Sequence, residues 1–133
     1  MPRKLPAQKT ERTPSQKGKH ARNKGASFER EVATQLRAVY PQAKRGLGQS
    51  RSAHEVPDVA GIPWWVEAKA HKRANIRRAF EQAVAASRAS AGATGTPLPV
   101  LVVSKDDGKP VLATMLFSDM LALLFDAETG GHA

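Results

Sequence analysis

The sequence lacks cysteine and long apolar runs, and each absence narrows the kinds of protein it can encode. Without cysteine, its 133 residues can form no disulfide framework, no thiolate zinc site and no cysteine nucleophile. No apolar stretch approaches the ~20 residues that a membrane-spanning helix requires. The basic N-terminus also lacks the apolar segment of a secretory signal. We therefore expect a cytoplasmic protein with no membrane association, of a length that fits one domain.

Acidic residues are almost absent from the first 24 residues, where Glu11 stands alone against eight basic side chains. Eight positive charges less one negative charge give this segment +7 of the formal net charge of +9. A basic tail suits a polyanion, because neutralised phosphates release condensed counterions; a solubilising tail is the alternative. Its polar composition predicts disorder over residues 1–23. An ordered domain is expected over 24–126, followed by a frayed C-terminus at 127–133.

Hydrophobic periodicity and turn residues predict eight elements in the order α-β-β-β-α-β-β-α. The predicted ranges are 27–40 (helix), 43–45, 56–60 and 64–68 (strands), 72–90 (helix), 98–103 and 111–116 (strands), and 118–125 (helix). The apolar run at 98–103 is typical of a strand buried on both faces. The helix before it serves as a crossover to the same sheet. The predicted fold is α/β, with a mixed central sheet flanked by helices.

Several side-chain placements follow from this pattern. The second helix is expected to face the sheet through Ile76, Phe80, Val84 and Ser87. Ser27 and Ser118 are expected to cap the first and last helices. Trp64 and Trp65, being adjacent in a strand, are expected to pack on opposite faces. The last helix carries a set of apolar residues for which core packing is favoured over a role as an interface. These residues are Met120, Leu121, Leu123, Leu124 and Phe125.

Asp58, Glu67 and Lys69 lie on two strands of one predicted hairpin. Side chains alternate along a strand, so Glu67 and Lys69 share a face, and the turn at 61–63 can bring Asp58 beside Glu67. Two close carboxylates repel, and a bound divalent cation relieves that conflict. Carboxylate oxygens and water are the ligands that Mg²⁺ prefers, with Mn²⁺ as a substitute. Lys69 can position or activate water or stabilise charge on a phosphate, which predicts phosphodiester hydrolysis. An exposed strand face with a salt bridge is the alternative.

Pro57-Asp58 followed by Glu67-Ala68-Lys69 resembles the signature of the PD-(D/E)xK nucleases. The stretch from Lys24-Gly25 to Glu29-Arg30-Glu31 resembles the opening of archaeal-type Holliday-junction resolvases, so the resemblance covers about residues 24–116. It implies a restriction-endonuclease-like core and a Mg²⁺-dependent, structure-selective DNA endonuclease. It further implies that Glu29 joins Asp58 and Glu67 at the metal and that Arg30 supports DNA contact. A homodimer acting on branched DNA is implied as well, because two strands must be cut symmetrically.

The resemblance also implies a basic residue between the first helix and Asp58, for which Arg45 and Arg51 are candidates. Further basic residues gather at the start of the second helix, where the helix dipole disfavours cations, and so indicate a phosphate partner. They are Lys72, Arg73, Arg77 and Arg78. Gln82 lies where some of these nucleases carry a helical glutamine. His54 and His71 flank the motif and are interpreted as loop residues that touch DNA or nothing.

Two features depart from the resolvase pattern. Proline before the aspartate is commoner in the wider superfamily, and the chain after Lys69 does not match the resolvase subgroup. A nicking or duplex-cutting nuclease of phage or defence origin, acting in the cytoplasm of a host cell, is therefore an alternative. A nucleic-acid-binding protein without catalysis is the alternative from another class. It leaves the arrangement of Asp58, Glu67 and Lys69 unexplained.

Overall fold

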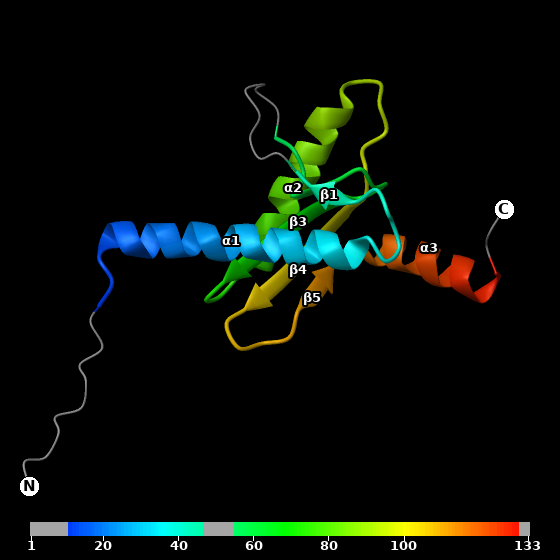
Figure 1. The fold of residues 1–133 in the computed structure, drawn as a ribbon. Helices are drawn as coiled ribbons and strands as arrows, with labels where there is room; N and C mark the ends of the chain where they lie inside the picture. The colour runs from blue at the N-terminus through cyan, green and yellow to red at the C-terminus, as the bar shows by residue number, and fades with distance from the viewer. Residues whose placement is uncertain (1–10, 47–54, 131–133) are drawn as a thin grey trace, which may run out of the picture.

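A computed structural model of the chain describes residues 11–46 and 55–130, and its element order is the predicted one. The chain forms three helices and five strands in the described ranges (Figure 1). Their bounds are α1 (Pro14–Leu36), β1 (Lys44–Arg45), β2 (Val59–Ala60), β3 (Trp65–His71), α2 (Ile76–Ala91), β4 (Val100–Asp106), β5 (Leu112–Thr114) and α3 (Phe117–Glu128).

The five strands form one mixed sheet in the order β1-β2-β3-β4-β5. Neighbouring strands are antiparallel except for β3 and β4, which run parallel from the pair Trp65 and Val100 to the pair His71 and Asp106. Parallel neighbours need a crossover connection, and α2 supplies it. The predicted α/β class, with a mixed central sheet flanked by helices, is therefore confirmed.

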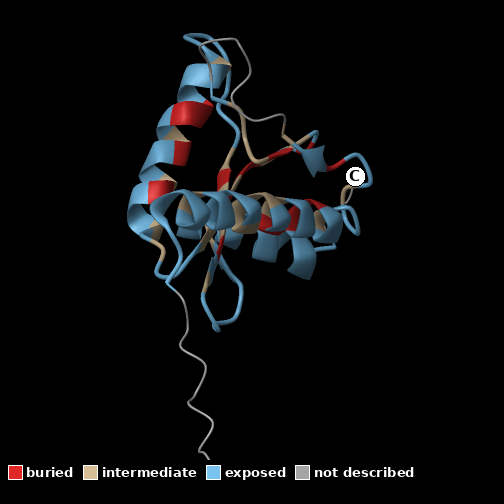
Figure 2. Ribbon diagram, turned by 60° about the vertical axis from the view of Figure 1, so that its left-hand side comes forward, coloured by how far each residue is buried: buried red, intermediate tan, exposed pale blue. Residues whose placement is uncertain are grey.

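The two faces of the sheet are covered by different helices. Val66 and Ala68 of β3 pack in the core cluster that contains Phe28 and Val32 of α1. The alternating residues Trp65 of β3 and Val102 of β4 pack instead with the alanines of α2. Figure 2 shows the buried positions of α2 as a band along one side of the helix. Trp64 packs against the α1 cluster, so the prediction that the two tryptophans lie on opposite faces is confirmed.

Helix α1 begins at Pro14, thirteen residues before the predicted start at Ser27. Thr13 and Gln16 form a capping box: the Thr13 hydroxyl accepts from the Gln16 N–H at 3.2 Å, and Gln16 Oε1 accepts from the Thr13 N–H at 2.9 Å. Proline at the first helical position favours the same start. Extending an anchored helix costs less than nucleating one. The disorder predicted through residue 23 was therefore wrong for residues 14–23, while residues 1–10 lie outside the described ranges.

The second helix also differs from its prediction. Its N-cap is Asn75, whose Oδ1 accepts from the Arg78 N–H at 3.1 Å, so the helix begins at Ile76 rather than near residue 72. Its buried side consists mainly of small residues, namely Ala79, Ala83, Ala86 and Ser87. The larger predicted core residues Ile76, Phe80 and Val84 are only half-buried. Alanines let the helix approach the sheet closely, which shifts the buried stripe away from the larger side chains.

Helix α3 has no buried residue, so the expectation that its apolar residues pack in the core was wrong. Its N-cap is Leu116, without a side-chain cap, rather than Ser118. The helix continues through Glu128, so the fraying expected from 127 does not hold at that position, and residues 131–133 lie outside the described ranges. Within the described ranges, no helix combines the length and apolar character needed to cross a bilayer.

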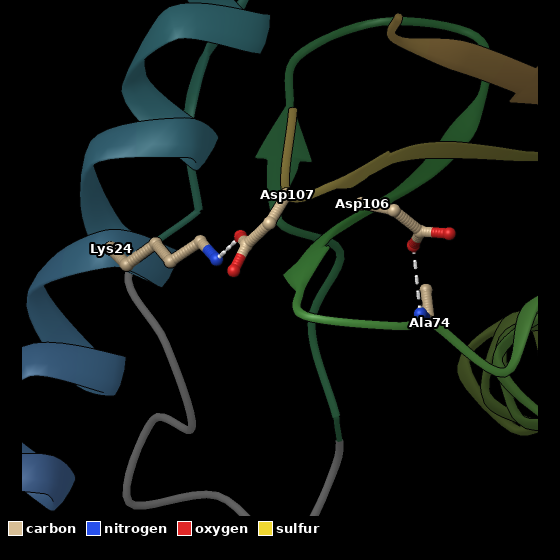
Figure 3. Close-up of polar contacts among 4 residues, drawn as sticks. All are labelled: Lys24, Ala74, Asp106 and Asp107. Atoms are coloured by element: carbon tan, nitrogen blue, oxygen red, sulfur yellow. Dashed lines mark hydrogen bonds and ion pairs between the residues drawn. The ribbon is translucent and has the colours of Figure 1, made fainter. Parts of the chain in front are cut away.

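Two neighbouring aspartates at the end of β4 tie the sheet to other elements (Figure 3). Asp106 Oδ1 accepts a hydrogen bond from the Ala74 N–H at 2.8 Å and so fixes the connection between β3 and α2. Asp107 forms an ion pair with Lys24 of α1. The predicted turn after β4 is confirmed, and Gly108 adopts a positive φ of 71° there.

Candidate active site

Asp58 is held by the backbone of the neighbouring strand. Its N–H donates to the Val66 carbonyl at 2.8 Å, and its Oδ2 accepts from the Ala68 N–H at 2.8 Å. Strand β2 contains only two residues, so the Asp58 side chain pairs a backbone group of β3 that lies beyond the end of β2. This contact fixes one oxygen of the carboxylate and directs the side chain along β3.

Glu67 and Lys69 project from β3 on the face covered by α2. Trp65 Nε1 donates a hydrogen bond to Glu67 Oε1 at 3.0 Å. Lys69 Nζ lies 3.9 Å from Glu67 Oε2, which is within ion-pair range and beyond hydrogen-bonding distance. The Glu67 side chain is 15% exposed and that of Lys69 is 34% exposed. The alternation of β3 thus places the carboxylate and the amine together at a half-buried position.

The two carboxyl groups destabilise each other's ionised form or are destabilised by their surroundings. Burial raises the pKa of Glu67 to about 7, and the charge of Asp58 raises it further, against the lowering effects of the Trp65 hydrogen bond and the Lys69 charge. Burial also raises the pKa of Asp58, and the charge of Glu29 adds to this effect. The hydrogen bond from Ala68 acts in the opposite direction. The site therefore holds negative charge at a cost that a nearby cation would offset.

Glu29 lies near this pair but is engaged elsewhere. Its Oε2 accepts from Arg45 Nε at 2.8 Å, which links α1 to β1. Among residues 11–46 and 55–130, no three histidine or acidic side chains converge closely enough to form a metal-binding group. The structure therefore brings Asp58 and Glu67 together, and gives Glu29 a partner of its own at the edge of the site.

A shallow hollow of about 160 Å³ adjoins Lys69 on the same face of the sheet. Its lining contains no acidic residue and is completed by the first two turns of α2. The lining residues are Lys69, His71, Ala74, Asn75, Arg78, Ala79 and Gln82. Two of the residues predicted to bind DNA, Arg78 and Gln82, are thus placed beside Lys69. This surface can accept an anion from a side where no carboxylate opposes it.

The other residues predicted to bind DNA are dispersed. Lys72 and Arg73 are exposed in the connection between β3 and α2, and Arg30 is exposed on α1. Arg77 lines a different hollow, together with Phe80 and Phe117. Arg51 and His54 lie outside the described ranges.

His71 belongs to the candidate site although it was interpreted as a loop residue. It ends β3 and shares the face of Glu67 and Lys69, because the strand continues three residues past its predicted end at Ala68. The signal that could have located it is the same two-residue alternation that placed Glu67 and Lys69.

The donor chemistry of the site fits a hard divalent cation. Asp58 and Glu67 offer carboxylate oxygens, and the partners of both groups leave part of their coordinating capacity unused. Comparisons with protein-family models, curated proteins and solved structures give no match. The fold and the site therefore define the class of protein by themselves: an α/β protein with a carboxylate pair and a lysine at one face of a mixed sheet.

Proposed function

We propose that this protein is a Mg²⁺-dependent endodeoxyribonuclease with a restriction-endonuclease-like core. The observation that carries the proposal is the meeting of Asp58 and Glu67 beside the Lys69 amine. Both carboxyl groups have a raised pKa, and Lys69 Nζ lies 3.9 Å from Glu67. A purely structural strand gains nothing from two half-buried carboxylates in contact, whereas a cation site requires them.

Asp58 and Glu67 would hold the cation, with Glu29 contributing from the edge of the site when its pair with Arg45 opens. Bound Mg²⁺ supplies positive charge that offsets the two carboxylates and polarises a phosphate oxygen. Lys69 would position the attacking water and stabilise the charge that develops on the phosphate. Trp65 would keep Glu67 ionised and correctly oriented through its indole N–H.

The DNA backbone would lie across the α2 face of the sheet. Arg78, His71 and Gln82 would contact the phosphate next to the one that is cleaved, because they line the hollow beside Lys69. Lys72 and Arg73 extend this basic surface from the adjoining connection. The first half of α1 offers a second basic surface, since it carries Lys17, Lys19 and Arg22 and no acidic residue.

The preferred substrate proposed here is branched DNA. The support is the resemblance of the stretch from Lys24 to Glu31 to the opening of Holliday-junction resolvases. The alternative is a nicking or duplex-cutting nuclease of phage or defence origin, which would use the same residues for the same chemistry.

The test is cleavage of matched substrates in Mg²⁺ and in Mn²⁺: a four-way junction, a linear duplex, a flap and a single strand. Glu67→Gln and Lys69→Met are expected to lower the rate by about 10² to 10³ or more while DNA binding persists. Two matched controls should cut like the wild-type protein. They are Glu81→Gln, on the exposed side of α2, and Lys105→Met, on the neighbouring strand β4 and exposed.

The outcomes separate the candidate functions. Symmetric incisions confined to the junction and lost in Glu67→Gln would support a resolvase. Incision of duplex or single strand would keep the nuclease site and replace the resolvase with the alternative nuclease. No metal-dependent cleavage of any substrate, combined with DNA binding that is indifferent to Glu67→Gln, would overturn the proposal in favour of a binding protein.

A further inference from the structure

Helix α3 presents apolar side chains around nearly its whole circumference without burying one of them. Phe117 and Phe125 are 74% and 69% exposed. At about 200 Å² per phenylalanine, these two alone leave roughly 280 Å² of apolar surface in water. The other exposed apolar residues of the helix are Met120, Leu121, Leu123 and Leu124. The largest apolar patch on a typical monomer is about 300–600 Å², so α3 exceeds what a monomer ordinarily exposes.

Two hollows adjoin the base of this helix on the body of the protein. One, of about 270 Å³, is lined by Ile76, Phe80, Leu116 and Phe117 among others, with Arg77 at its side. The second, of about 410 Å³, lies between α2 and the start of β4, and includes Val84, Leu98 and Arg88. The half-buried side chains of α2 that do not face the sheet thus open onto an apolar surface with two arginines.

The charges of the helix and of this surface are opposite. Helix α3 contains three acidic residues, Asp119, Asp126 and Glu128, and no basic residue. The hollows contribute Arg77 and Arg88. An acidic apolar helix complements an apolar surface that carries arginines. The same absence of lysine and arginine makes α3 unsuited to an anionic lipid surface, which binds helices with basic polar faces.

We infer that α3 of one copy docks across the hollows beside α2 of a second copy, and that the exchange is reciprocal. A two-fold dimer repeats the contact, because the same surface serves both partners. Helix α3 and the lining of the two hollows amount to about as many residues as one side of a standard interface, roughly 20 to 30. Helix α3 projects away from the sheet at the end of β5, where a second copy can reach it (Figure 1). This inference does not depend on the proposed nuclease activity.

The test is the mass of the full chain in solution, measured by light scattering and sedimentation without DNA or Mg²⁺. The wild-type protein is expected to have twice the mass of the chain at tens of micromolar and to dissociate on dilution. Leu121→Asp combined with Phe125→Asp should give a monomer with an unchanged circular dichroism spectrum, because both side chains are exposed. The matched control is Val39→Asp, since Val39 is 71% exposed after α1, and it should remain dimeric.

A charge exchange tests the identity of the partner. One variant, Arg77→Glu with Arg88→Glu, makes both docking surfaces acidic. A second, Asp126→Lys with Glu128→Lys, makes the helices basic. Each variant alone should be at least tenfold weaker as a dimer, and an equimolar mixture should restore association, because both contacts of the mixed dimer are again complementary.

Three results would overturn the inference. They are a monomer at every concentration up to about 100 µM, a dimer that persists in the Leu121→Asp/Phe125→Asp variant, and no recovery on mixing the charge variants. A monomer that instead binds vesicles containing phosphatidylglycerol would assign α3 to a lipid surface. Loss of DNA cleavage with an intact dimer would leave this inference standing and overturn only the proposed function.

Discussion

Trp65 Nε1 donates a hydrogen bond to Glu67 Oε1 at 3.0 Å, although the two residues are only two positions apart on the same strand. The indole is buried, with 2% of its surface exposed, and it lies on the face covered by α2. A side chain of the core thereby orients the carboxylate and favours its ionised form, since a hydrogen bond to a charged acceptor lowers its pKa.

Replacing this donor should weaken the site without removing a carboxylate. Trp65→Phe is expected to raise the pKa of Glu67 further and to increase the Mg²⁺ concentration needed for half-maximal cleavage about tenfold, from the loss of a hydrogen bond to a charged group. Trp64→Phe is the matched control, because it loses a bond of similar length, 3.2 Å to the Tyr40 hydroxyl, on the other face. Equal Mg²⁺ requirements in the two variants would refute the role given to Trp65.

The raised pKa of Glu67 predicts how stability depends on pH in the metal-free protein. The folded-state pKa of about 7 lies above the ordinary value of 4.5, so the protonated group favours the folded state. Its contribution is fully present below pH 4.5 and is lost as the pH rises through 7, by up to about 3 kcal/mol. Urea unfolding at pH 5 and pH 8 should show this loss in the wild-type protein, with a clearly smaller loss in Glu67→Gln.

Added Mg²⁺ should reverse the trend, because it binds the ionised carboxylates. The stabilisation by the cation should be larger at pH 8 than at pH 5, and absent in Glu67→Gln. Identical pH profiles for the wild-type protein, Glu67→Gln and the control Glu81→Gln would contradict the assignment of the raised pKa.

The pair formed by Glu29 and Arg45 predicts a graded effect at the edge of the site. Glu29→Gln removes a charge that raises the pKa of Asp58 and releases Arg45 from α1. We expect cleavage to fall about tenfold, much less than with Glu67→Gln, since Asp58 and Glu67 remain together. Glu31→Gln, two residues along α1 and exposed, is the control and should cut normally. A loss as large as that of Glu67→Gln would make Glu29 an equal member of the site.

The capping box at the start of α1 predicts a local change in helix stability. Thr13→Ala removes the hydroxyl that accepts from Gln16, at a cost of about 1 kcal/mol to the first turns. Hydrogen exchange should accelerate over residues 14–23, whereas the denaturant midpoint of the whole domain should hardly change, because the first buried side chain of the helix is Phe28. Ser15→Ala is the control. A shift of the global midpoint by the full amount would show that this segment is coupled to the core.

The parts of the fold that sequence predicted well depend on local patterns. The apolar run at 98–103 and the turn after it identified β4 and the hairpin with β5. Strand alternation also put Glu67 and Lys69 on one face and the two tryptophans on opposite faces. These features depend on neighbours two or three residues away, which the chain itself specifies.

The errors arose where distant packing decides. Periodicity selected the large residues Ile76, Phe80 and Val84 as the inner face of α2, but the sheet accepts the helix through Ala79 and Ala83. The hydrogen bond from Ala68 to Asp58 and the ion pair of Lys24 with Asp107 join residues far apart in the sequence, and no local signal marks them. The start of α1 did have a local signal, in Thr13, Pro14 and Gln16, and the basic composition concealed it.

Asp58 serves two purposes, because the carboxylate proposed to hold a cation also completes the backbone pairing of β3 at Ala68. Its loss would therefore expose an edge of the sheet as well as disable the chemistry. A descendant of this chain that abandoned catalysis would still gain from an aspartate at this position, whereas Glu67 and Lys69 would be free to drift. Among future relatives, retention of Glu67 and Lys69 is consequently the better indicator of an active enzyme, and Asp58 alone indicates only the shared architecture.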